Sequence, residues 1–228
     1  MSLPRRILLW DIDGTLVHND HAGLIAMNRT FRAMFEFEEE QDPLDGIDFA
    51  GASDRWIVRR VAQSLGIDWD EAQDAAFIDR YEGILREVLH EREGRVLPGV
   101  EAALDALARE DVVQGLGTGN FRRSAFVKLD HYGLGGHFVD GGFGDDSPNR
   151  PELLAVGLER MRMHADASAD CVVVGDTVHD ISAGHAIGAR VVAVSTGFND
   201  RERLREAGPE VLLDDLADTE LALAALLG

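Results

Sequence analysis

The hydrophobic positions follow two different patterns along the chain. Residues 7–10 form a short apolar run that suits a buried strand, and similar short runs recur after residue 110. Between residues 18 and 94, apolar side chains instead recur every three or four positions, which predicts helices. We therefore expect one strand, then a helical segment, and then a region in which strands and helices alternate.

The helical segment carries three apolar stripes at helical spacing. They are Leu24, Met27, Phe31 and Met34; Ile57, Val61 and Leu65; and Phe77, Tyr81, Ile84 and Val88. The segment ends near Gly94 and the turn-forming residues 97–99. This pattern predicts a helical bundle inserted after the first strand, with the stripes forming its core rather than a ligand pocket.

The last region alternates between the two patterns. We expect helices over residues 100–107, 124–132, 151–163, 181–187 and 216–227, and strands over 111–116, 136–140, 171–174, 191–194 and 212–213. Such alternation predicts an α/β fold with a parallel sheet and helices on both faces. We assign residues 1–17 and 95–228 to this α/β region and residues 18–94 to the helical insert.

The composition indicates which binding partners and which cellular compartment suit this protein. Hydrophobic residues make up 45% of the 228 positions, enough for a core. The net charge of −20 disfavours nucleic acid and anionic membranes as partners. Cys171 is the only cysteine, no apolar run is long enough to span a membrane, and no signal-peptide pattern is present. We expect a cytoplasmic protein.

Polar residues follow three of the expected strands. Asp11 and Asp13 follow the first, Thr118 follows a later one, and Asp176 and Asp180 follow another. Ligands bind at the carboxyl ends of strands in parallel sheets. Each group read alone also suits an acidic turn or a helix cap. The coincidence of three such groups favours one site, where clustered carboxylates need a counter-charge.

The residue types in these groups are more specific than the spacing between them. Residues 11–16, Asp-Ile-Asp-Gly-Thr-Leu, resemble the D-x-D-G-T-[LV] signature of the haloacid dehalogenase-like superfamily. Thr118 resembles its second motif, and Gly175-Asp176 with Asp180 resembles its fourth, G-D-x-x-x-D. The resemblance covers the whole chain. It implies a Rossmann-like core with a helical cap inserted after the first strand, as in phosphoglycolate phosphatase-like members.

The family's third motif is a Lys or Arg upstream of the fourth, and two residues are candidates. Lys128 lies in a helical pattern only ten residues after Thr118, and we expect it to face solvent. Arg150 stands before Pro151 at a helix start, which suits the family's placement. Lys128 is the chain's only lysine, so an arginine in this role is unsurprising. We predict Arg150.

The resemblance implies phosphoryl transfer through an aspartyl-phosphate. Asp11 would be the nucleophile, and Asp13 would protonate the leaving alkoxide and then take a proton from water. Mg²⁺ would be held by Asp11, by Asp176 and by the backbone carbonyl of Asp13. Asp180 would orient Asp176 or a metal-bound water. The phosphate oxygens would be held by Thr118, Gly119, Asn120 and Arg150.

Several functions are compatible with parts of this pattern. Asp13 argues against the dehalogenase branch, which lacks an acid at that position. The absence of lysine from residues 18–94 argues against the phosphonate-cleaving branch, which needs one in its cap. We predict a Mg²⁺-dependent phosphatase acting on a small phosphorylated metabolite. A phosphomutase, or a non-catalytic binding protein on this fold, remains the alternative.

One stretch of the insert resembles a substrate-facing loop. Residues 51–55, Gly-Ala-Ser-Asp-Arg, are similar to the G-x-[ST]-D loop of phosphoglycolate phosphatase-like members. We expect Asp54 to be a helix N-cap. Arg55 and Arg59 would share one helix face and favour a small anionic group such as a carboxylate. The alternative is a capped helix with ordinary surface arginines. Residues 36–45 should form a solvated acidic face.

Overall fold

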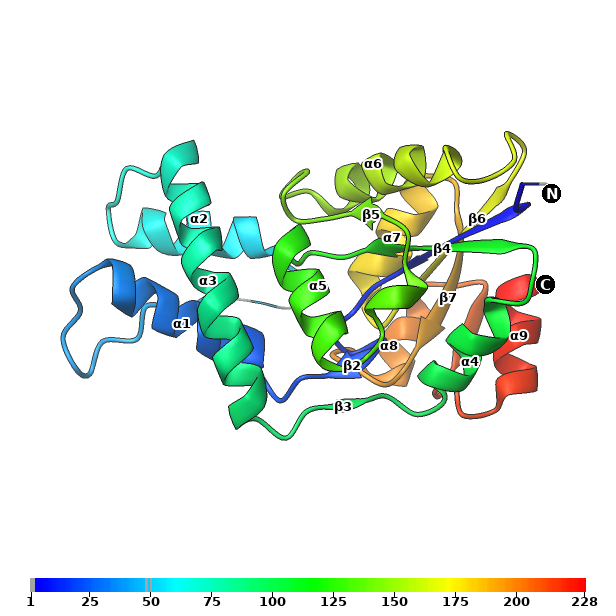
Figure 1. Ribbon diagram of the computed structural model, residues 1–228, viewed down its shortest axis with the longest axis horizontal. Coiled ribbons are helices and arrows are strands. Elements are labelled where there is room, and N and C mark those ends of the chain that lie inside the picture. Colours follow the sequence, from blue (N-terminus) through cyan, green and yellow to red (C-terminus); the bar gives the residue numbers. More distant parts are fainter. Residues whose placement is uncertain (1–2, 48, 50) are drawn as a thin grey trace.

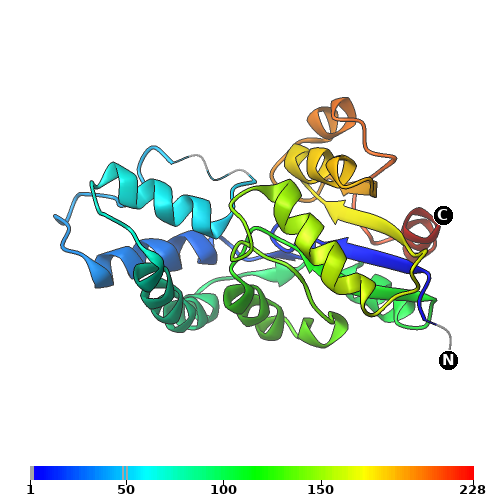
Figure 2. The same ribbon diagram turned by 90° about the horizontal axis from the view of Figure 1, so that it is seen from above.

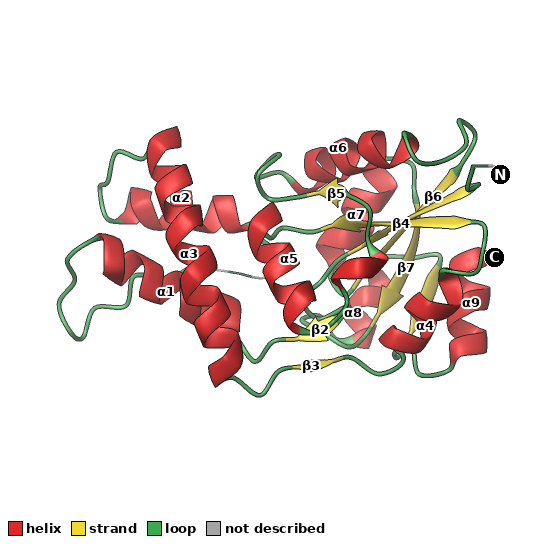
Figure 3. Cartoon of the chain, in the orientation of Figure 1, coloured by secondary structure: helices red, strands yellow, loops and turns green. Residues whose placement is uncertain are grey.

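The computed structural model describes residues 3–47, 49 and 51–228. Within them, six parallel strands form a sheet in the order β5-β4-β1-β6-β7-β8. Figure 3 shows the strands in yellow among the red helices. The strands are β1 (Arg6–Trp10), β4 (Val112–Gly117), β5 (Gly141–Gly142), β6 (Asp170–Gly175), β7 (Arg190–Val194) and β8 (Val211–Leu213). The predicted α/β fold is confirmed.

Strand β1 lies near the middle of the sheet, between β4 and β6. Leu8 is paired with Gln114 on one side and with Val172 on the other. Residues 7–10 are completely buried. Leu8 belongs to the apolar cluster on one face of the sheet and Leu9 to the cluster on the other. An apolar run without alternation is therefore what this strand requires.

Helices cover both faces of the sheet (Figure 2). One face packs against α4 (Val100–Leu107), α5 (Arg122–His131) and α9 (Thr219–Leu227). The other packs against α6 (Arg150–Arg162), α7 (Val178–Ala186) and α8 (Arg201–Glu206). The loops that leave the carboxyl ends of the strands point toward the remaining part of the chain, at the left of Figure 1.

That remaining part contains α1 (Ala22–Met34), α2 (Asp54–Ser64) and α3 (Glu71–Glu91), which we call the cap (Figure 1). A short antiparallel ribbon of β2 (Val17–His18) and β3 (Arg95–Val96) joins the two connections between the cap and the sheet. The cap helices enclose an apolar cluster that is completed by Val127 of α5 and by Phe121, the residue before this helix. The cap and the sheet region therefore share a hydrophobic core.

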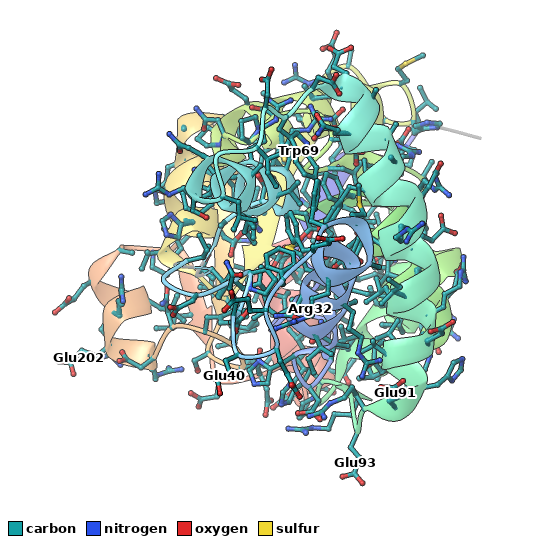
Figure 4. All side chains as sticks on the ribbon, turned by 90° about the vertical axis from the view of Figure 1, so that its left-hand side faces the viewer. Arg32, Glu40, Trp69, Glu91, Glu93 and Glu202 are labelled. Atoms are coloured by element: carbon teal, nitrogen blue, oxygen red, sulfur yellow. The ribbon has the colours of Figure 1, made fainter. Side chains whose placement is uncertain are left out.

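The outer surface of the cap is acidic, as expected. Glu36, Glu38, Glu39 and Glu40 are all exposed. Figure 4 looks onto this end of the molecule, and the labelled Glu93 projects from its margin. No helix of the described chain is long and apolar enough to cross a membrane.

Short and glycine-rich elements differ from the prediction. The strand expected over residues 136–140 is wrong: a 3-10 turn (Gly135–His137) lies there, and β5 follows with only two residues. An apolar residue stands at position 138 because Phe138, which follows this turn, packs into the core. Helix α8 and the ribbon of β2 and β3 were not predicted, because elements this short carry little periodic signal.

Candidate active site

The loops at the carboxyl ends of three neighbouring strands form the candidate site. Asp11 and Asp13 follow β1, Thr118 follows β4, and Asp176 follows β6. The side chains of Asp11, Thr118 and Asp176 are buried. Parallel neighbouring strands end at the same edge of a sheet, so residues separated by more than 160 positions meet there. The structure thus brings together the groups that the sequence motifs single out.

The turn after β1 depends on Gly14. Its φ of +89° lies in the region that favours glycine. A Cβ on Gly14 would also lie only 2.6 Å from Oδ2 of Asp176, and one on Gly197 would lie 2.0 Å from the same atom. The absence of side chains at Gly14 and Gly197 therefore lets the Asp176 carboxylate lie against the turn after β1.

Asp11, Asp176 and Asp180 form a buried carboxylate cluster. One oxygen of each lies within 4.8 Å of the others. Burial, helped by the charges of Asp180 and Asp13, raises the pKa of Asp11 to about 6. Burial and the charges of Asp11 and Asp180 also raise the pKa of Asp176 well above its usual value. Carboxylates held this close together fit a divalent cation with oxygen ligands.

Neighbouring groups hold two members of this cluster in place. The Thr15 hydroxyl donates to Asp176 at 3.0 Å, and the Phe198 N–H donates to it at 2.7 Å. Asp180 accepts from the hydroxyl of Thr177 at 2.6 Å and from its N–H at 3.1 Å. The Asp180 N–H in turn donates to the Thr177 hydroxyl oxygen at 3.2 Å, which completes a capping box at the start of α7. The other Asp180 oxygen points toward the cluster.

Arg150 enters the cluster from the first residue of α6. Its Nη2 lies 2.8 Å from Oδ1 of Asp11 and also pairs with Asp180. Burial lowers the pKa of Arg150, but the two carboxylates outweigh this and raise it. Among the described residues, no hydrogen-bond partner faces its buried Nε. Arg150 therefore lies where the third-motif prediction requires a cation.

The expectation that Lys128 faces solvent is wrong. Lys128 is 3% exposed, and its Nζ lies 2.6 Å from both Oδ2 of Asp13 and Oδ1 of Asn120. A lysine reads as polar in a hydrophobicity pattern, so its burial was missed. The sequence offers one signal, because Lys128 lies three residues after the apolar Ala125 and so shares a helix face with it.

Asn120 forms hydrogen bonds within the site and does not cap α5. Helix α5 starts at Arg122 and has no side-chain cap from Phe121. Asn120 Nδ2 donates at 2.8 Å to both Asp13 and Thr118. Asn19, from the connection into the cap, also donates to Asp13. Asp13 is thus held by two amides and Lys128.

The predicted N-cap role of Asp54 is also wrong, since Ser53 caps α2 by accepting from the Trp56 N–H. The Asp54 carboxylate instead accepts from the Phe121 N–H at 2.9 Å and the Ser124 hydroxyl at 3.2 Å. It therefore binds the start of α5 from the cap. Burial raises the pKa of Asp54 to about 6, although Lys128 opposes the shift.

Arg55 and Arg59 do not face the site. Both pair with Asp74 of α3, at 3.8 and 3.0 Å. Neither lines the cavity between the cap and the strand ends. The expected arginine face for a substrate anion is therefore wrong: a buried carboxylate within the cap attracts both guanidinium groups.

The cavity has a volume of about 120 Å³ and two contrasting walls. The core wall carries Asp11, Asp13, Thr118, Gly119, Asn120, Lys128 and Arg150. The cap wall carries Leu24, Met27, Phe49, Ala52, Asp54 and Ile57. The expectation that the apolar stripes form core rather than a pocket is therefore wrong for Leu24, Met27 and Ile57, which line the cavity at the edge of the cap cluster. The charged side chains of the lining therefore lie mainly on the core wall, and Asp54 is the exception on the cap wall.

Comparison with known proteins agrees with this geometry. Residues 8–194 match the family model described as haloacid dehalogenase-like hydrolase. The chain belongs to this family. A phosphoglycolate phosphatase from Pseudomonas aeruginosa is 30% identical, with 95% of this chain and 78% of the relative covered. A probable phosphatase, IndB, from Dickeya dadantii is 28% identical over 97% of this chain and 94% of the relative. The predicted family and its phosphatase branch are confirmed.

Solved structures support the fold. CbbY from Rhodobacter sphaeroides in complex with phosphate superposes with a TM-score of 0.71 at 20% identity, covering 99% of this chain and 100% of the other. A putative β-phosphoglucomutase from Thermotoga maritima gives 0.62 at 23% identity, covering 96% and 98%. These likenesses show that this haloacid dehalogenase-like chain shares the fold of both proteins.

Proposed function

We propose that this hydrolase cleaves a small phosphomonoester through a phosphorylated Asp11. The observation that carries the proposal is the separation of the two β1 carboxylates. Asp11 lies in the acidic cluster beside Arg150. Asp13 lies outside it, held by Asn120 and Lys128. Two neighbouring carboxylates in such different surroundings suit two different roles.

The chemistry divides between these carboxylates. An oxygen of Asp11 attacks phosphorus, the P–O bond to the ester oxygen breaks, and an aspartyl-phosphate forms. Asp13 gives its proton to the departing alkoxide. Water then attacks the same phosphorus after losing a proton to Asp13, which frees inorganic phosphate and restores Asp11.

Groups around the cavity are placed to hold the phosphate oxygens. Thr118, Gly119 and Asn120 present a hydroxyl, a backbone turn and an amide at the end of β4. Arg150 adds a guanidinium beside Asp11. Lys128, which the motifs did not single out for this role, adds a second cation on the same wall.

The metal in this proposal is Mg²⁺. Asp11, Asp176 and the backbone carbonyl of Asp13 would hold it, and Asp180 would orient the group. When bound, it offsets the repulsion between the Asp11 carboxylate and a phosphate dianion. The support comes from three buried carboxylates within 4.8 Å, which are hard oxygen donors in need of positive charge.

Release of inorganic phosphate tests the proposal. The purified chain would be offered small phosphomonoesters with Mg²⁺, and in parallel with a chelator. We expect steady phosphate release that the chelator abolishes. Isomerised sugar phosphate without free phosphate would instead indicate a mutase. A folded, metal-loaded protein that binds phosphate but turns over no ester would contradict both enzymatic readings.

A further inference from the structure

We infer that the alcohol portion of the substrate is small, uncharged and largely apolar, and that it carries no carboxylate. This inference rests on the proposed phosphatase activity and specifies its substrate class. It separates this chain from relatives named phosphoglycolate phosphatase, whose named substrate is a carboxylate-bearing ester. Four features of the cavity carry it.

The first feature is the position of the cations. In the described lining of the cavity, Lys128 and Arg150 are the only lysine and arginine. Both lie on the core wall, and each is already paired, Lys128 with Asp13 and Arg150 with Asp11. Both are placed to serve the phosphate group, so no arginine or lysine of this lining is left for a second anion.

The second feature is the arrangement of the cap arginines. Arg55 and Arg59 would be suitable partners for a substrate carboxylate, but both face Asp74: Arg59 donates a hydrogen bond to it at 3.0 Å, and Arg55 forms a looser ion pair with it at 3.8 Å. Asp74 is buried, and the Trp69 indole N–H donates to its other oxygen at 2.8 Å. Moving either arginine toward the cavity would weaken the pairing of a buried charge, which is costly.

The third feature is the apolar character of the cap wall. Leu24, Met27, Phe49, Ala52 and Ile57 line it. A carboxylate placed against these side chains would lose its hydration without gaining a partner. An alkyl group there would be removed from water favourably. His21 also lines the cavity, but its side chain is exposed, so it lies in contact with solvent rather than within this wall.

The fourth feature is the charge of the cap wall. Asp54 is its one carboxylate among the described lining residues. Its pKa of about 6 leaves it mainly ionised at neutral pH. A second anion on the substrate would meet this charge in a partly desolvated space, where repulsion is stronger than in water.

Three esters of similar size test the inference on the intact protein with Mg²⁺. They are 2-phosphoglycolate, the amide of 2-phosphoglycolate, and isobutyl phosphate, whose branched end has the shape of the carboxylate without its charge. We expect kcat/KM for isobutyl phosphate to exceed that for 2-phosphoglycolate by about tenfold or more, a factor equivalent to one lost polar contact. The amide should fall between them.

A charge introduced into the cap wall sharpens the test. Leu24 is half-buried on α1 and lines the cavity. We expect Leu24→Arg to shift the ratio of kcat/KM values toward 2-phosphoglycolate. Leu24→Gln, a polar but uncharged change, is the matched control and should not produce that shift. Circular dichroism and thermal unfolding would establish that both variants are folded.

The outcomes separate this inference from the proposed function. Equal or greater activity on 2-phosphoglycolate than on isobutyl phosphate overturns the inference and leaves the phosphatase proposal standing. If that activity disappears in His21→Asn, the carboxylate is recognised by His21 at the solvent-exposed side of the cavity. Failure of the folded, metal-loaded protein to hydrolyse any ester, including p-nitrophenyl phosphate, overturns the proposed function itself.

Discussion

The core wall and the cap wall of the cavity are built by opposite means. On the core wall, charged side chains each have several partners: Asp13 alone is bound by Asn19, Asn120 and Lys128. On the cap wall, most side chains are apolar, and the arginines of α2 lie outside the wall and pair with Asp74. On our proposal, the residues of the core wall carry out the reaction, and the apolar cap wall restricts which alcohol portion of the substrate can bind.

The two walls are also held differently. The core wall extends directly from adjacent strands in the buried sheet. The cap is joined by two connections and meets the core through the shared cluster around Phe121 and through Asp54, whose N–H also donates to the Gly119 carbonyl at 2.8 Å. Asp54 is therefore a buried polar contact between the cap and the start of α5, where Arg123 also pairs with Asp79 and Glu82 of α3.

The largest effect should follow from Asp11→Asn. The amide cannot attack phosphorus, so we expect kcat to fall by on the order of 10⁴-fold. The fold should survive, because the substitution removes one of three mutually repelling buried carboxylates. Steady-state phosphate release and thermal unfolding are the measurements. Undiminished Mg²⁺-dependent turnover would exclude Asp11 as the nucleophile.

Lys128→Met should have the next largest effect. It keeps the length of the side chain but removes the cation that lies 2.6 Å from Asp13. We expect a loss in kcat of about 10²-fold, because Asp13 is no longer held for proton transfer. The pH profile of kcat should change with it. A double variant with Asp13→Asn should lose little more than Asp13→Asn alone; full additivity would show that the two residues act separately.

Asp54→Asn should change how stability depends on pH. A carboxyl whose pKa rises from 3.8 to about 6 on folding keeps its proton longer in the folded state. Its contribution to stability is therefore lost as the pH rises from about 4 through 6. We expect the free energy of unfolding of the wild type, relative to Asp54→Asn, to fall by on the order of 3 kcal/mol across this range.

Denaturant unfolding of both proteins at several pH values between 4 and 7 measures this difference. The asparagine keeps an acceptor for the Phe121 N–H, so the comparison isolates the charge. Parallel pH profiles for the two proteins would contradict the buried, shifted carboxyl at this position.

The smallest effect on activity should come from the double change Arg55→Met and Arg59→Met. Both arginines bind Asp74 away from the cavity, so kcat/KM should change less than about twofold. Stability should fall by about 1–2 kcal/mol, since Asp74 loses charged partners. Arg60→Met, an exposed neighbour on α2, is the control and should alter neither quantity. A large rise in KM would place these arginines in the substrate site after all.

The sequence alone determined the α/β fold, the family and most of the residues on the core wall. Residues 7–10 are apolar because both faces of a central strand are covered, and a strand of that kind cannot be mistaken for a surface element. The motif residues Asp11, Thr118 and Asp176 each follow a strand, and parallel strands bring their carboxyl ends to one edge. Local pattern and chain order are sufficient for this part.

Only the tertiary structure decided the partners of charged side chains. Lys128 reads as a surface lysine, yet the direction of α5 turns it onto Asp13. Arg55 and Arg59 read as a ligand face, yet α3 places Asp74 beside them. Hydrophobic periodicity indicates which face of a helix is buried. A charged side chain can be buried only beside a partner of opposite charge, and here that partner is distant in the sequence. The cavity's two walls therefore became visible only when the helices were packed together.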